Sequence, residues 1–70
     1  MDRTSVDSSL IKSLGYEVSS LTLEVEFHTG SVYQYLEVPS DIYEDLCSSD
    51  SVGKSFNALV KKQGYEFKQV

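Results

Sequence analysis

The stretch LTLEVEFHTGSVYQYLEVP, residues 21–39, decides the fold of this 70-residue chain. Apolar and polar residues alternate without interruption over residues 21–28, and this two-residue period is typical of a strand with one buried face. The polar residues of this strand then face the other side, which predicts an antiparallel sheet covered on a single face. Its core-facing residues are Leu21, Leu23, Val25 and Phe27.

A second strand is predicted over residues 31–38, after a turn centred on Thr29 and Gly30. Tyr33 and Tyr35 are separated by one residue, so both side chains emerge on the same face of this strand. A two-residue turn would leave both tyrosines on the polar face of the sheet. A three-residue turn would shift the register by one and point both into the core. The sequence leaves both registers open.

Two short helices are predicted after this strand. Pro39 ends the strand and can open the first helix, since its missing N–H is no loss in a first helical turn. This helix is expected to end near Ser48, and residues 48–51 carry the start signal of the second. Gly64 is the expected stop of the second helix. Apolar residues at helical spacing give each helix one buried face.

Two further segments read as strands. Residues 9–18 predict a strand at the start of the sheet, and residues 65–70 alternate apolar and polar residues as a short edge strand does. Residues 1–8 are polar and are expected to form a flexible N-terminal segment, which leaves a single domain over residues 9–70. We therefore expect an α+β fold: a three- or four-stranded antiparallel meander followed by two short helices packed on one face.

Charge is distributed unevenly along the chain, whose net charge is −5. Residues 1–53 hold ten acidic residues against two basic ones, giving −8, whereas residues 54–70 hold four lysines against one glutamate, giving +3. The overall acidity argues against nonspecific binding of nucleic-acid duplexes, but a local basic face can still contact RNA or an acidic partner.

Cellular location and assembly follow from what the sequence contains. Cys47 is the only cysteine, so no internal disulfide can form and a reducing cytoplasm is expected. The polar N-terminus and the absence of a run of about 20 apolar residues predict no signal peptide and no membrane segment. A chain this short buries a small core, and we expect a monomer or a weak homodimer.

No reactive centre is indicated. His28 is the only histidine, and without a second histidine or a neighbouring cysteine it cannot assemble a zinc site, so it is expected to be a solvated turn residue. Cys47 follows an apolar helical pattern and is expected in the core. We therefore predict no enzyme activity, no metal and no cofactor.

Binding surfaces are the stronger candidates. On an exposed sheet face, Tyr33 and Tyr35 could stack two unpaired bases; in the other register they fill the core. Lys54 and Lys61 are about two helical turns apart and so share a face, with Asn57 between them. This face is the best candidate for an anion contact, and a solvated helix face is the alternative.

Several short motifs, taken in their order and spacing, resemble the KTSC domain family, which is named after the C-terminus of lysyl-tRNA synthetase, where some members are appended. The similarity spans residues 8–68. It implies a small module, stand-alone or appended, without implied enzyme activity; the function of the family is not established, although RNA binding has been suggested. The matching elements are Ser8-Ser9-Leu10-Ile11, Gly15-Tyr16, Leu21 to Phe27, Tyr33-Gln34-Tyr35, Val38-Pro39 and Ser51-Val52-Gly53-Lys54-Ser55-Phe56-Asn57.

Two functions follow from these patterns. The first is a small non-catalytic module that binds RNA through Tyr33, Tyr35, Lys54, Asn57 and Lys61. The alternative is a protein-interaction module or inhibitor of the kind carried by phages and mobile elements, in which the acidic surface of residues 17–50 docks a basic partner. Either would suit a bacterial or phage protein.

Overall fold

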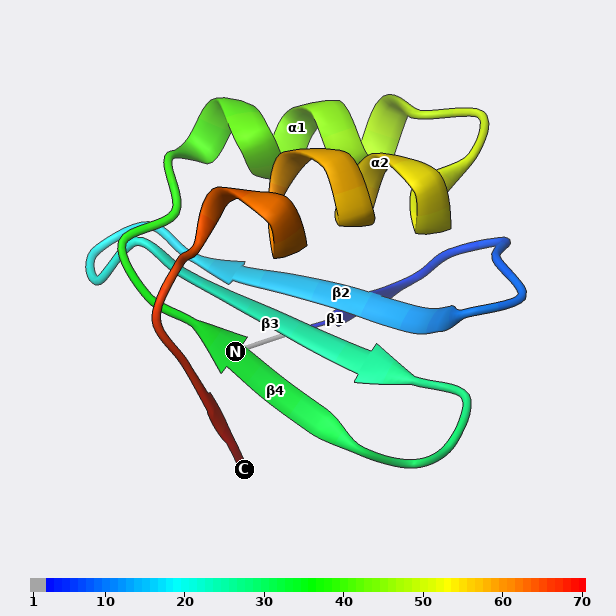
Figure 1. The fold of residues 1–70 in the computed structure, drawn as a ribbon, viewed down its shortest axis with the longest axis horizontal. Helices are drawn as coiled ribbons and strands as arrows, with labels where there is room; N and C mark the ends of the chain where they lie inside the picture. Colours follow the sequence, from blue (N-terminus) through cyan, green and yellow to red (C-terminus); the bar gives the residue numbers. More distant parts are fainter. Residues whose placement is uncertain (1–2) are drawn as a thin grey trace.

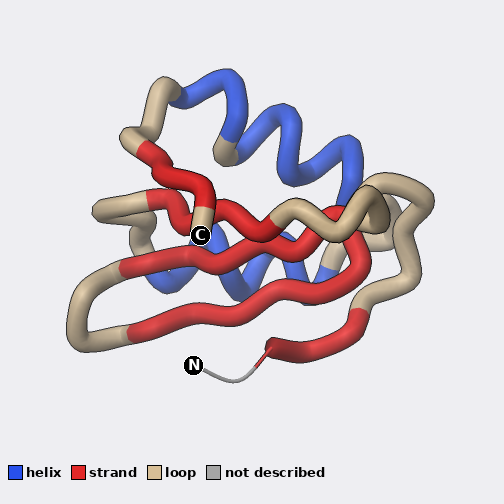
Figure 2. Tube along the Cα trace, turned by 90° about the horizontal axis from the view of Figure 1, so that it is seen from below, coloured by secondary structure: helices blue, strands red, loops and turns tan. Residues whose placement is uncertain are grey.

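A five-stranded antiparallel sheet carries two helices on one of its faces in the computed structural model, which describes residues 3–70 (Figure 1). The strands follow one another in chain order across the sheet. Seen from below, the sheet lies on the near side of the molecule and the helices lie behind it (Figure 2). The elements are β1 (Arg3–Ser5), β2 (Ile11–Glu17), β3 (Thr22–Phe27), β4 (Val32–Tyr35), α1 (Ser40–Ser48), α2 (Val52–Leu59), the 3₁₀ turn η1 (Lys61–Gln63) and β5 (Phe67–Gln69).

The predicted α+β fold is confirmed, with more strands than expected. The additional strand is β1, which pairs with β2 from Arg3 opposite Gly15 to Ser5 opposite Ser13. It lies in the segment that was predicted to be a flexible lead-in. The residues of β1 are polar and exposed, so no hydrophobic period marks the strand, and its pairing with β2 defines it.

The hairpin between β3 and β4 turns over residues 28–30, because Phe27 lies opposite Ser31, and this three-residue turn settles its register. The Phe27 N–H donates to the carbonyl of Ser31 (2.9 Å), and the Gly30 N–H donates back to the carbonyl of Phe27 (2.9 Å). Gly30 has a φ of 94°, which a side chain would disfavour. Val25 therefore pairs with Tyr33 and Leu23 with Tyr35, so both tyrosines face the helices.

The helices cover the apolar face of the sheet and close one core. Pro39 caps α1, as its fixed φ allows. Val60 ends α2 with a φ of −120°, so Lys61 lies in η1 and not on the second helix, where it was predicted. Gly64 follows η1 in the left-handed conformation. The buried apolar residues are Ile11, Leu14, Leu23, Val25, Tyr35, Val38, Leu46, Val52, Phe56 and Val60.

Two residues expected in the core lie outside it. Leu21 precedes β3 with a φ of 53°, and its side chain is exposed, because the β2–β3 turn uses this residue to reverse the chain. Its carbonyl accepts the Val38 N–H at 2.8 Å. Cys47 is exposed, because α1 directs the preceding Leu46 to the sheet and the next residue lies about 100° further around the helix.

Tyr16 ties α1 to the sheet. Its ring stacks on that of Tyr43, with centroids 5.2 Å apart. Its hydroxyl donates to the carbonyl of Val38, just after Glu37, whose φ of 57° is left-handed. Burial raises the pKa of both phenols, with the Asp41 carboxylate adding to the shift at Tyr16 and the side chain of Cys47 adding to it at Tyr43.

Candidate functional site

An aromatic pocket of about 240 Å³ opens between α2 and the end of the sheet formed by β3, β4 and β5. Most of its lining is apolar, and the side chains of Asn57 and Lys61 contribute its polar part. Four of the five residues predicted from the sequence as a binding site therefore converge here. The lining residues of this aromatic pocket are Leu10, Phe27, Tyr33, Tyr35, Phe56, Asn57, Lys61 and Phe67.

Strand register and helix spacing bring the rings together. Tyr35 lies opposite Phe67 in the β4–β5 ladder, and their ring centroids are 5.3 Å apart. From above, Phe56 on α2 packs edge-on against Tyr35 at 5.5 Å and against Phe27 at 5.7 Å. Edge-to-face pairs at these separations are favourable beyond simple area burial. The rings thus form one connected cluster.

The exposed two-tyrosine platform, one of the two alternatives left open by the sequence, is not present. Tyr35 is 7% exposed, because Phe56 and Phe67 both pack against its ring, and burial raises the pKa of its phenol, with Tyr33 adding to the shift. Tyr33 is half-buried and meets Phe67 edge-on at 5.8 Å. The most accessible ring of the pocket is that of Phe67, which is 59% exposed.

Asn57 and Lys61 supply the polar part of the aromatic pocket. Both side chains are exposed, Asn57 on α2 and Lys61 on η1. The amide of Asn57 can donate and accept hydrogen bonds, whereas the Lys61 ammonium only donates and carries a positive charge. No acidic side chain among the described residues lines this pocket.

Lys54 belongs to a neighbouring hollow. This second hollow, of about 380 Å³, lies between the start of α2 and the β1–β2 loop and is also lined by Asp7 and Asp50. Asn57 lines both hollows. Lys54 and Lys61, which the sequence placed on one anion-binding face, therefore stand on either side of Asn57, and only Lys61 lines the aromatic pocket.

Four pocket residues were absent from the binding site predicted from the sequence: Leu10, Phe27, Phe56 and Phe67. Phe67 had a usable signal, because residues 65–70 alternate as a strand that could pair beside Tyr35. Leu10 comes just before β2 and is 41% exposed, whereas Phe67 is on β5. These two residues are far apart in the sequence, and β3 and β4 lie between β2 and β5 in the sheet. Which side chains line a hollow depends on this packing and not on any local pattern.

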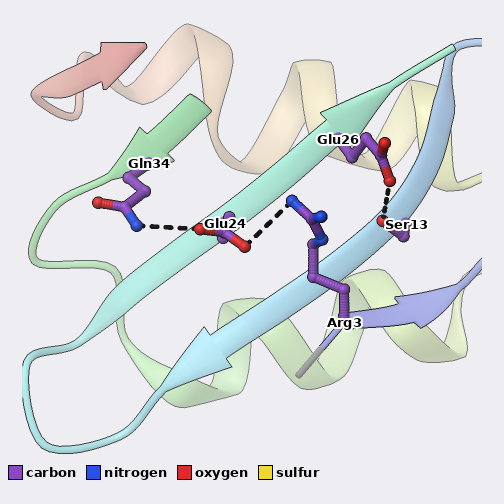
Figure 3. A network of polar contacts seen from close by, with 5 residues as sticks. All are labelled: Arg3, Ser13, Glu24, Glu26 and Gln34. Carbon is purple, nitrogen blue, oxygen red and sulfur yellow. Dashed lines mark hydrogen bonds and ion pairs between the residues drawn. The ribbon is translucent and has the colours of Figure 1, made fainter. Parts of the chain in front are cut away.

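The opposite face of the sheet carries a polar network (Figure 3). Glu24 lies 3.2 Å from a guanidinium nitrogen of Arg3 and accepts a hydrogen bond of 2.9 Å from the side-chain amide of Gln34. Glu26 accepts a hydrogen bond of 2.9 Å from the Ser13 hydroxyl. These carboxylates, central to the expected acidic docking surface, are engaged within the sheet. The docking of a basic protein stays a prediction.

Other polar groups hold loops in place. The Nε2 atom of His28 lies 2.7 Å from the carbonyl oxygen of Ser8, and this contact, together with the His28 N–H to the carbonyl of Leu10 at 3.2 Å, fixes the β1–β2 loop against the β3–β4 hairpin. Over residues 3–70, no group of three or more His, Cys, Asp or Glu side chains is placed to hold a metal ion. None of the helices within this part of the chain has the length and apolarity to cross a membrane.

Relatives of the chain occur both alone and within larger proteins. An uncharacterised protein of Stutzerimonas stutzeri (strain A1501) is 40% identical over 67 residues, which covers 96% of this chain and 94% of the relative. A lysine–tRNA ligase of Nostoc punctiforme is 41% identical over 64 residues. The match covers 91% of this chain but only 11% of the ligase, so the chain is similar to a small part of that enzyme.

A solved structure and a family model agree with the fold. The crystal structure of a KTSC domain protein from Yersinia pestis superposes with a TM-score of 0.92 at 32% identity, over 99% of this chain and 96% of that one. The model of the KTSC domain matches residues 7–65, which is most of the chain and includes α1, α2 and three of the strands. The chain therefore belongs to the KTSC domain family.

Proposed function

We propose that this domain is a non-catalytic module that binds RNA through the aromatic pocket. The observation that carries the proposal is the convergence of Tyr33, Asn57, Lys61 and Phe67 on one hollow. Aromatic rings stack on unpaired bases, an amide can pair with base edges, and an ammonium attracts phosphate. The similarity to part of a lysine–tRNA ligase, an enzyme named for an RNA, supports the same choice of ligand.

The charge distribution supports a localised contact. Residues 54–70, which include most of α2 and all of η1 and β5, hold four lysines against one glutamate, whereas the rest of the chain is acidic. A phosphate chain would be attracted to the side of the molecule that carries Lys61 and repelled by the remainder. Binding of this kind has few phosphate contacts, so we expect modest affinity and a shallow but measurable dependence on salt.

A charge-reversal pair tests this proposal. Fluorescence anisotropy with a labelled single-stranded RNA of mixed sequence measures affinity between about 50 mM and 200 mM salt. Lys61→Glu is expected to weaken binding about tenfold and to reduce the salt slope by about one, because it removes one phosphate contact. Lys12→Glu, an equal change of charge on β2 outside the aromatic pocket, is the matched control.

The two variants separate local from general electrostatics. The proposal predicts a much larger loss for Lys61→Glu than for Lys12→Glu. Equal losses would mean that net charge alone governs binding and that the aromatic pocket has no special role. Failure of the native chain to bind this RNA or a tRNA at low salt would refute RNA binding altogether.

A further inference from the structure

The aromatic pocket offers a free ring surface at one end only. Tyr35 is enclosed between Phe56 and Phe67. Tyr33 packs edge-on against Phe27, with ring centroids 5.7 Å apart, and against Phe67 at 5.8 Å. Only Phe67, on the short edge strand β5, is exposed over more than half of its surface. A flat ligand ring can therefore stack at one position and not at two.

We infer that the aromatic pocket takes a single unpaired RNA base, stacked on Phe67, with the amide of Asn57 at the base edge and Lys61 at the adjoining phosphate. This inference rests on the proposed function and narrows it. It corrects the count of bases expected from the two tyrosines, because Tyr35 serves as the buried support of Phe67. It also predicts that the preferred RNA has a loop, bulge or single-stranded segment.

A base suits this lining better than an apolar peptide side chain does. A purely apolar anchor would leave the Asn57 amide and the Lys61 ammonium beside a surface that offers them no hydrogen-bond acceptor. A nucleotide offers a flat ring, an edge with donors and acceptors, and a negative charge within one unit. The absence of acidic side chains from the lining described above suits a ligand with that charge.

Paired bases cannot use the aromatic pocket. In an A-form duplex each base is stacked between its neighbours, and the deep major groove is too narrow for side chains to read. The pocket lies between α2 and the sheet, so its ligand must enter from the side as a protruding group. An unpaired base has no pairing to lose, so the free energy needed to move it out of the stack is small.

Three synthetic RNAs test the inference with the whole chain. The first is a duplex with one bulged nucleotide, the second is the same duplex fully paired, and the third carries an abasic site at the bulge. We expect the bulged RNA to bind about tenfold more tightly than either of the others, because they lack the stacked base. Anisotropy at low salt measures all three affinities.

Phe67→Ala identifies the ring responsible. The variant is expected to lose about tenfold in affinity for the bulged RNA and to bind the abasic RNA as the native chain does. Val70→Ala is the matched control, since Val70 is another apolar residue at the same edge with the same 59% exposure but outside the pocket lining. Asn57→Asp, on an exposed position of α2, tests the same pocket without touching β5.

The outcomes distinguish this inference from the proposed function. Equal binding of all three RNAs, with Lys61→Glu still weakening it, would overturn the single-base site and leave RNA binding intact. Such a result would favour an apolar side chain of a partner protein as the ligand of the aromatic pocket. No binding of any of the three at low salt would overturn both. Native affinity for the bulged RNA in both Phe67→Ala and Asn57→Asp would also overturn the inference.

Discussion

Phe56 belongs both to the core of the domain and to the lining of the aromatic pocket. Replacing it with leucine measures how much its ring contributes to the free energy of unfolding. The side chain is 1% exposed and packs edge-on against the rings of Phe27 and Tyr35. Phe56→Leu removes two ring pairs, each worth about 0.5–1.5 kcal/mol beyond area burial, and leaves unfilled space at a buried position, which adds about 1 kcal/mol. The free energy of unfolding should therefore fall by about 2 kcal/mol. A domain of this size has a total of about 3.5–10 kcal/mol, so the variant should still fold.

Urea denaturation followed by tyrosine fluorescence gives the free energy directly. With a slope of about 1 kcal/mol per M, the midpoint should fall by about 2 M. Phe67→Leu is the matched control: it also removes two ring pairs, but the side chain is mostly exposed and leucine leaves no buried gap there, so it should cost no more than about 1 kcal/mol. Equal losses for the two variants would refute the view that burial, and not ring pairing alone, stabilises the cluster.

Smaller effects are expected from the backbone, the phenols and the open face of the sheet. Glu37→Gly should raise the free energy of unfolding by about 0.5 kcal/mol, because a left-handed non-glycine residue costs about 1–2 kcal/mol and the flexibility of glycine offsets only part of this; a lower thermal midpoint would contradict it. The free energy of unfolding should stay constant from pH 8 to about pH 10, the ordinary pKa of tyrosine, and fall above it. Burial raises the folded-state pKa of Tyr16, Tyr35 and Tyr43, so the unfolded chain loses these protons first. Urea midpoints measured from pH 8 to pH 11 check this, and a midpoint that rises with pH would contradict it. Arg3→Ala should cost about 0.5 kcal/mol at low salt and less at high salt, because its ion pair with Glu24 is partly exposed; a loss that does not change with salt would point to β1 packing instead.

Much of the fold could be predicted from the sequence because it follows from local periods. The alternation over residues 21–28 marks β3, and Pro39 and Gly64 mark the ends of the helical region. What could not be predicted depends on geometry between segments. The turn before β4 could hold two or three residues, and this single difference decides which face carries Tyr33 and Tyr35.

The candidate site was also only partly predictable from local sequence patterns. Tyr33, Asn57 and Lys61 were predicted from residue type and spacing, and they meet in space. Phe67 lies in a segment whose alternation predicts a strand, but neither it nor Leu10 is marked as a pocket residue by its local sequence. Each gains that role from strand order and from the helix packed on the sheet. The short strand β1 escaped prediction for a related reason: its three polar residues are ordered by pairing with β2 and not by burial.

Two side-chain amides on opposite sides of the sheet show whether RNA binds at the aromatic pocket. Asn57 lines the pocket, whereas Gln34 lies on the opposite face, where its amide donates to Glu24. In a nitrogen–proton correlation spectrum of the labelled protein, titration with the bulged RNA should shift the Asn57 amide signals and leave those of Gln34 in place. Movement of the Gln34 signals with those of Asn57 unchanged would place the binding surface on the other face of the sheet and contradict RNA binding at the aromatic pocket.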